Sequence, residues 1–223
     1  MAGCAGGDDA EPDATMAVVP SEPVTVTGDG VRVTVEPGPN SVLTAVVRVE
    51  TDRPTRIRLV AATAGHRVVV PASGRSRRRQ TVALVGLRPE TTYDLRLRGD
   101  PALAGLEGEI RFGTGSLPAD LPVVDTHLDG DPRPGATLFN ATPSDLSVDH
   151  PGNLIAVDDE GEVVWYHQDD QLISDARQLP DGDLLYNVGN IGAREIDVLG
   201  RVVRDWTTST RLRAGPVDRF GHP

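Results

Sequence analysis

Residues 153–167 read NLIAVDDEGEVVWYH, and residues 193–206 read AREIDVLGRVVRDW. An offset of 39 residues superimposes the two stretches and aligns residues of the same kind: Val157 with Ile196, Asp158 with Asp197, Gly161 with Gly200, Val163 with Val202 and Val164 with Val203. The tryptophans, Trp165 and Trp206, fall two positions out of register, which keeps them on the same face of a strand. Asp and Gly favour tight turns, so each stretch predicts a hairpin.

A third hairpin signal, LPDGDLLYNVG at 179–189, lies between these two, with Asp181 and Gly182 at its turn. Each period of about 40 residues thus predicts four short strands, which is typical of a β-propeller blade. Residues 137–223 suffice for two blades at most, whereas a six-bladed ring needs on the order of 250 residues. We therefore expect 137–223 to be the first one to two blades of an incomplete propeller in a fragment of a longer protein. A ring completed by a partner or by domain swapping is the other arrangement.

Residues 22–116 alternate between apolar and polar positions in about seven short runs separated by turn residues, which predicts an all-β sandwich. The runs are VTVTGDGVRVTVEPG (24–38, two strands), SVLTAVVRVETD (41–52), TRIRLVAATAG (55–65), HRVVVPA (66–72), QTVALVGL (80–87), TYDLRLRG (92–99) and GEIRFGTG (108–115). Within them LRPETTYDLRLRG (87–99) resembles a fibronectin type III domain, in which the residues matching Leu87 and Tyr93 pin a corner between strands. Residues 117–136 are expected to be a linker.

Composition excludes several functions for the 223 residues. A net charge of −11 argues against a non-specific nucleic-acid binder. One cysteine allows no disulfide framework, and the five histidines show no metal-ligand spacing, so neither a metal nor another cofactor is expected. No apolar run reaches the roughly 18 residues that a membrane span needs.

The first 21 residues are expected to be a flexible linker behind a lipoprotein-like start. Their opening, MAGCAGGDDAEPDAT, resembles the end of a bacterial lipoprotein signal, although the charged and apolar segments of such a signal are missing. We expect Cys4 to be the acylated first residue of the mature protein, with a true start further upstream. The other interpretation is a free thiol on a flexible tail.

The order of the parts resembles the amino-terminal portion of the bacterial arylsulfate sulfotransferase family. The segments that carry the resemblance, behind the β-sandwich, are SLPADLP (116–122), PGATLFNATP (134–143), NLIAVDDEGEVVWYH (153–167) and DARQLPDGDLLYNVG (175–189). The resemblance implies a six-bladed propeller enzyme of the cell envelope, periplasmic or extracellular. Such an enzyme transfers a sulfuryl group from a phenolic sulfate to a phenol through a histidine, while further histidines and an arginine stabilise the sulfate oxygens.

In that family, paired histidines precede an L-P-x-G turn. Ile173 and Ser174 stand at these positions here, although Asp175 matches the acidic one. His222 falls where the next segment begins, with Pro223 in place of the second histidine. His222 is therefore the candidate sulfate contact, with a surface loop histidine as the alternative, and the nucleophile is expected beyond the chain end, leaving these 223 residues inactive.

The remaining histidines and arginines have structural interpretations. His66 is expected to cap a turn and His167 to lie at a strand edge, while His127 and His150 fall in loops. One basic run lies between two predicted strands and is expected to be a solvated hairpin tip, with binding of phosphate or anionic lipid as the alternative. The run consists of Arg75, Arg77, Arg78 and Arg79.

Two other functions remain open for the whole protein. A non-catalytic envelope binding lipoprotein fits the departures at Ile173, Ser174 and Pro223. Quinone- or metal-dependent propeller enzymes have repeats of the same D-x-x-G-x-x-x-W type, but this sequence contains no carboxylate-rich calcium loop.

Overall fold

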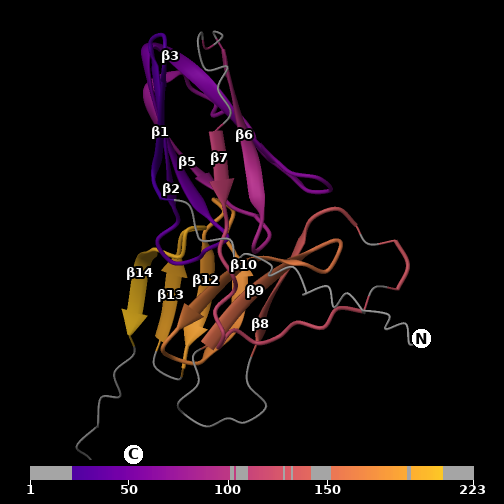
Figure 1. Cartoon of the computed structure of the whole chain (residues 1–223). Coiled ribbons are helices and arrows are strands. Elements are labelled where there is room, and N and C mark those ends of the chain that lie inside the picture. Colours follow the sequence, from indigo (N-terminus) through magenta and orange to yellow (C-terminus); the bar gives the residue numbers. More distant parts are fainter. Residues whose placement is uncertain are drawn as a thin grey trace, which may run out of the picture.

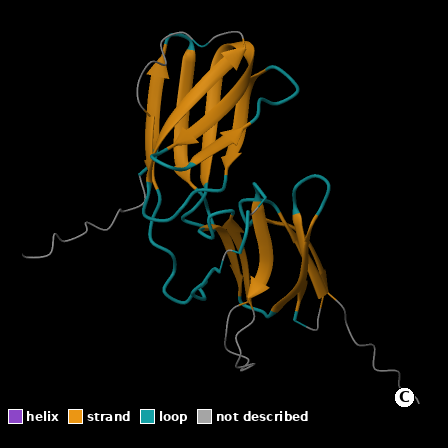
Figure 2. Ribbon diagram, turned by 90° about the vertical axis from the view of Figure 1, so that its right-hand side faces the viewer, coloured by secondary structure: helices purple, strands orange, loops and turns teal. Residues whose placement is uncertain are grey.

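The computed structural model of the chain describes residues 22–100, 103, 110–127, 129–131, 133–141, 152–189 and 192–207. Every regular element in these ranges is a β-strand, and every strand pairing is antiparallel, so the expected all-β class is confirmed. One seven-stranded sheet stands at one end of the molecule, and two smaller sheets stand at the other (Figures 1 and 2). Within the described ranges there is no helix long and apolar enough to cross a membrane.

The first sheet is nearly closed around its own core. Its strands are β1 (Val24–Gly28), β2 (Val31–Pro37), β3 (Ala45–Ala62), β4 (Arg67–Val70), β5 (Arg77–Leu84), β6 (Thr92–Asp100) and β7 (Ile110–Gly113). The core side chains come from alternate positions of these strands and include Val33, Val47, Leu59, Tyr93 and Phe112.

The long strand β3 holds the first sheet together. Its first half pairs with β2 and β5, and its second half pairs with β4 and β6. The register against β5 shifts between Glu50 and Thr55, around Pro54, whose missing N–H cannot extend a ladder. The sequence predicted two separate strands at 41–52 and 55–65. They form one strand because the chain continues past the proline and only its pairing partners change.

Strand β5 begins earlier than expected. Arg77, Arg78 and Arg79 are its first three residues, and Arg77 and Arg79 pair with β3 on either side of the register shift, so the prediction that the three form a hairpin tip is wrong. Their side chains are exposed, as is that of Arg75 just before the strand. The strand extends through them because ladder pairing uses only backbone groups.

The second half of the chain forms a three-stranded and a four-stranded sheet. The first contains β8 (Ala136–Ala141), β9 (Gly152–Asp158) and β10 (Val163–Asp169), in the order β10-β9-β8. The second contains β11 (Ile173–Gln178), β12 (Leu184–Val188), β13 (Gly192–Ile196) and β14 (Val202–Thr207), in sequence order. The three predicted hairpins are thereby confirmed as β9–β10, β11–β12 and β13–β14.

Two further clusters of buried side chains connect these sheets. One lies between the two smaller sheets, around Trp165 and Tyr186. The other joins Leu43 of the amino-terminal half to Ile155 and Tyr166, and Leu121 from the expected linker packs into it. The segment around Leu121 therefore fills a core that both halves of the chain share.

The shared core predicts coupled unfolding. Leu43→Ala leaves a cavity in a fully buried site, which costs about 2–5 kcal/mol. Both tryptophans lie in the carboxy-terminal half. We expect their fluorescence and the far-UV circular dichroism to shift to the same lower denaturant midpoint in the variant. A tryptophan transition that stays at the wild-type midpoint would show that the two halves unfold independently.

Candidate functional site

The loop from β5 to β6 is fixed from inside the first sheet. The hydroxyl of Tyr93 accepts a hydrogen bond from the backbone N–H of Arg88 at 2.8 Å, and Thr114 Oγ1 donates to the Arg88 carbonyl at 2.6 Å. Leu87 and Tyr93 are both fully buried. The predicted corner pinned by Leu87 and Tyr93 is thus present, and it fixes the backbone from which the Arg88 side chain projects.

The Arg88 side chain joins the first sheet to the turn between β9 and β10. Its Nε and Nη2 atoms donate to Asp158 Oδ2 at 2.9 and 2.6 Å, and Nη2 also donates to Glu160 Oε2 at 2.8 Å. The Asp158 side chain is only 9% exposed. His66 completes the contact: its Nε2 donates to the Gly86 carbonyl at 2.8 Å, and its Nδ1 lies 3.8 Å from Asp158 Oδ2.

Electrostatics keep this contact charged at neutral pH. Burial alone raises the pKa of Asp158, but hydrogen bonds from Arg88 and from the N–H groups of Glu162 and Glu160 outweigh it and hold the pKa below its ordinary value. The same bonds raise the pKa of Arg88 in spite of burial. A largely buried carboxylate that accepts two guanidinium bonds at one oxygen forms a strong, charge-assisted pair.

The repeated Asp residues build the same turn twice. Asp158 Oδ1 accepts from the N–H groups of Glu160 and Glu162, each at 3.0 Å. Asp197 Oδ1 accepts from those of Leu199 and Arg201, each at 2.9 Å. The glycines of both turns have positive φ, 86° at Gly161 and 75° at Gly200, which L side chains rarely adopt. The two Asp residues differ in their second oxygen, because the arginine nearest to Asp197 Oδ2, Arg201, lies 3.9 Å away.

A buried polar network crosses between the two smaller sheets. The Tyr186 hydroxyl donates to Asp169 Oδ2 at 2.7 Å, and His167 Nε2 lies 3.0 Å from the same hydroxyl. Arg194 donates through Nη1 to Asp169 Oδ2 at 2.5 Å and through Nη2 to Asp205 at 3.0 Å. The network ties β10, β12, β13 and β14 together.

Proton positions in this network follow from its acceptors. Asp169 can only accept, so the tyrosine proton points to it and His167 Nε2–H donates to the tyrosine oxygen. His167 Nδ1 is then a bare acceptor, and it is buried without a hydrogen-bond partner in the described structure. Burial lowers the pKa of His167 and raises that of Tyr186, so both side chains are neutral at pH 7.

The location of the network defines what it can do. His167, Asp169 and Tyr186 are all less than a tenth exposed, so a substrate does not reach them without rearrangement of the sheets. Burial raises the pKa of Asp169, but bonds from Tyr186 and the Gln171 N–H bring it below the ordinary value. The ionised Asp169 therefore serves as the acceptor that orders its neighbours.

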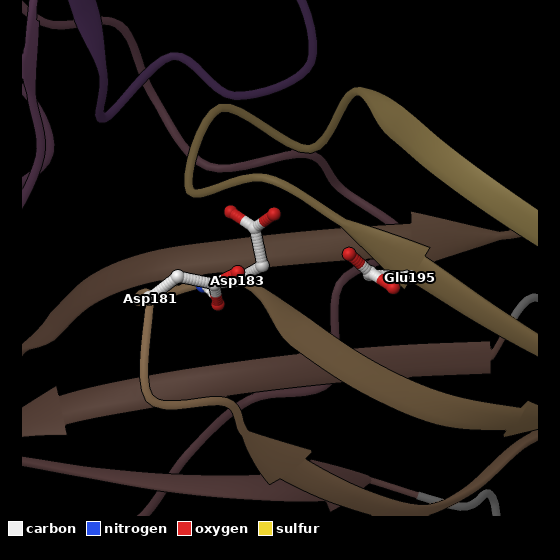
Figure 3. A group of neighbouring side chains, drawn as sticks. All are labelled: Asp181, Asp183 and Glu195. Carbon is white, nitrogen blue, oxygen red and sulfur yellow. Dashed lines mark hydrogen bonds between the residues drawn. The ribbon is translucent and has the colours of Figure 1, made fainter.

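Three carboxylates meet where the β11–β12 hairpin lies beside β13 (Figure 3). Ligand atoms of Asp181, Asp183 and Glu195 all lie within 4.8 Å of one another. Partial burial and the neighbouring carboxylates raise the pKa of Asp183. Oxygen ligands suit Ca²⁺ or Mg²⁺, but Arg204 Nη1 already donates to Glu195 Oε2 at 3.3 Å. Arg204 thus neutralises the buried member of the trio, and we assign no metal to it.

A cavity of about 370 Å³ lies between the β5–β6 loop and the two smaller sheets. The cavity is open because several of the side chains that line it are small, among them Ala136, Ala156 and Ala176. The Trp165 indole N–H donates to the Val198 carbonyl at 2.8 Å, so its ring forms part of an apolar wall. The volume lies in the range of small-ligand pockets, but few polar groups converge on it.

The structure describes only some of the histidines that the sequence analysis considered. Cys4 and His222 lie outside the described residues, as does His150. His127 is exposed on the segment before β8. Ile173 is 1% exposed and packs in the core between the two smaller sheets. Strand β11 therefore carries a core side chain where the family resemblance implies a histidine.

Sequence reasoning missed the role of His167. It lies in an edge strand, β10, but its side chain is buried and contacts the Tyr186 side chain of β12. A signal was present in the alternation of Trp165, His167 and Asp169, which places all three on one face of a strand. The arginine partner lies in register opposite Tyr186 on the next strand, but no local pattern indicates that pairing.

Compared with models of protein families and with curated proteins, the chain matches none.

Removing the charge at Asp158 tests the junction, and Asp197 provides a matched control. Asn retains the Oδ1 acceptor of each turn, so Asp158→Asn loses mainly the pair with Arg88. We expect it to lower the free energy of unfolding at pH 7 by about 2 kcal/mol more than Asp197→Asn does. The pKa of Asp158 is lowered in the folded state, so its stabilisation is present above the ordinary value of 3.8 and is lost as pH falls below it. The difference in unfolding free energy between the two variants should therefore disappear below pH 3.8. Equal losses of stability in the two variants at pH 7 would contradict a stabilising pair between Asp158 and Arg88.

Tyr186→Phe tests the buried network. The variant leaves His167 Nε2 without a partner, which costs about 1–3 kcal/mol, and removes one of the hydrogen bonds on Asp169, which keeps those from Arg194 and the Gln171 N–H. Tyr166→Phe is the control, because that hydroxyl accepts one bond, from the Val42 N–H at 3.2 Å. Urea denaturation should show a larger loss for Tyr186→Phe. A smaller loss than in the control would mean that the network contributes little.

Proposed function

We propose that the protein is a β-propeller protein of the arylsulfate sulfotransferase type. In this proposal β1–β7 form a fibronectin type III-like sandwich, and the two smaller sheets are propeller blades. The observation that carries the proposal is the Asp turn repeated at a spacing of 39 residues, with the same backbone bonds at Asp158 and Asp197. The bond between Tyr93 and the Arg88 N–H, a tyrosine corner, supports the sandwich.

The proposed reaction is sulfuryl transfer from a phenolic sulfate to a phenol. A neutral imidazole nitrogen attacks the sulfur, and the donor phenolate leaves with the electron pair of its S–O bond. The acceptor phenol oxygen then attacks the same sulfur, loses its proton and displaces the imidazole. Charge on the sulfate oxygens is stabilised by further donors. The proposal needs no cofactor.

The described histidines do not supply the nucleophile. His66 and His167 are engaged in hydrogen bonds, and His127 is an exposed loop residue. The proposal therefore places the nucleophile outside the described residues and retains His222 as a sulfate contact. It also places the protein in the cell envelope, with acylated Cys4 as its anchor.

A non-catalytic envelope binding protein is the second candidate, and Ile173 favours it. This side chain is buried in a core, and Ser174 follows it, so β11 presents no imidazole. A blade that has exchanged its histidine for a packing residue fits a propeller that serves as a binding scaffold.

Nitrophenol release distinguishes the two candidates. Nitrophenyl sulfate is supplied with phenol to residues 1–223 and, in parallel, to the product of the complete reading frame. We expect ping-pong turnover by the complete product and none by residues 1–223. His222→Ala in the complete product should lower kcat/KM about 100-fold, and the control His127→Ala should leave it unchanged. Absence of turnover with every phenol tried would reject the enzyme in favour of the binding protein.

A further inference from the structure

Charge is divided unequally along the chain. Residues 22–116 contain 14 arginines and 10 acidic residues, whereas residues 117–223 contain 8 arginines and 19 acidic residues. Strands β1–β7 stand at one end of the molecule and β8–β14 at the other (Figures 1 and 2). The molecule therefore has a basic end and an acidic end.

Unpaired arginines gather on the outer face of β3 and β6. Arg58 lies directly opposite Arg98, and Arg96 lies one pair further along, opposite Val60. All three arginines are exposed, while the residues between them in each strand, such as Leu59, face the core. Residues two apart along a strand are about 6.6 Å from each other, and neighbouring strands are about 4.8 Å apart. Three guanidinium groups thus share a small area of one face.

These three arginines have no acidic partner in the described structure, unlike others on the same face. Arg56 pairs with Asp100, and Arg111 with Asp94, at the two ends of the paired region. Arg58, Arg96 and Arg98 form no salt bridge with any described residue. Like charges directly opposite each other destabilise a sheet, so this arrangement has a cost that a bound anion would remove.

Some arginines on the other side of the same domain are paired. On the outer side of β2, β3 and β5, Arg48 pairs with Glu36, and Arg79 pairs with Glu50 at 3.3 Å. Arg32 lies directly opposite Glu50. Arg48 and Arg79 on this side thus have acidic partners, although Arg77 and Arg78 at the start of β5 are exposed without a salt bridge to a described residue.

We propose that the outer face of β3 and β6 binds an anionic lipid surface through Arg58, Arg96 and Arg98. The three side chains are exposed on the same face of β3 and β6, so one plane of phosphate headgroups can contact them together. The exposed Val69 of β4 lies beside them, in register with Val60. A planar surface meets this face alone, whereas a flexible soluble polyanion would also encounter the acidic end and be repelled.

The test measures binding of residues 1–223 to vesicles of phosphatidylglycerol and phosphatidylcholine, with pure phosphatidylcholine as reference. Binding should need phosphatidylglycerol and weaken with salt. The variant Arg58→Gln, Arg96→Gln, Arg98→Gln should bind about 100-fold more weakly, since each arginine contributes about fivefold. The matched control, Arg32→Gln, Arg48→Gln, Arg79→Gln, removes the same charge from the other side, where these arginines lie beside Glu36 and Glu50, and should stay within about twofold of wild type.

The outcomes separate the alternatives. Thermal melts should show that the first triple variant is at least as stable as wild type, because repulsion has been removed. Equal weakening by both triples would mean that only net charge matters and would overturn the proposal. Retention on heparin that depends on the first triple, without binding to vesicles, would overturn it in favour of a soluble polyanion. Absence of vesicle binding at low salt would reject it outright.

Discussion

Arg88 connects the two halves of the protein because it is held from both sides. Its backbone is fixed by the Tyr93 hydroxyl and by Thr114, and its guanidinium is fixed by Asp158. A flexible arginine side chain ordinarily loses much conformational freedom when it pairs. Here that cost is offset by bonds from the guanidinium to two carboxylates, those of Asp158 and Glu160. The buried apolar cluster around Leu43 and Ile155 supplies the rest of the contact between the two halves.

The Asp turn shows how one local motif acquires two uses. At Asp197 the carboxylate caps its own turn, with Arg201 at 3.9 Å. At Asp158 the same cap leaves Oδ2 free to accept from Arg88, 70 residues away along the chain. The first repeat therefore carries the junction, and the second closes a hairpin that leads into the exposed strand β14. The difference comes from what packs against each turn and not from the turn itself.

The local part of this account could be predicted from the sequence. Asp and Gly at fixed spacing predict the hairpins, and Leu87 with Tyr93 predicts the corner, because these devices use contacts within a few residues. The continuity of β3 through Pro54 was not predictable in the same way, since it depends on which strands pair with each half. The pairs Arg88–Asp158 and His167–Tyr186 join segments distant in sequence. The alternation of residues along a strand predicts which face a side chain lies on, but it does not predict which residue of another strand the side chain contacts. The predicted site residues Cys4 and His222 stay predictions, because they lie outside the described residues.

The central claim is that the junction at Arg88 makes the two halves one rigid body. Residual dipolar couplings of backbone amides in weakly aligned protein test it most directly. The account predicts that couplings from β1–β7 and from β8–β14 fit one alignment tensor with the same magnitude and orientation. Two tensors of different magnitude would show that the halves move relative to each other and would contradict the claim.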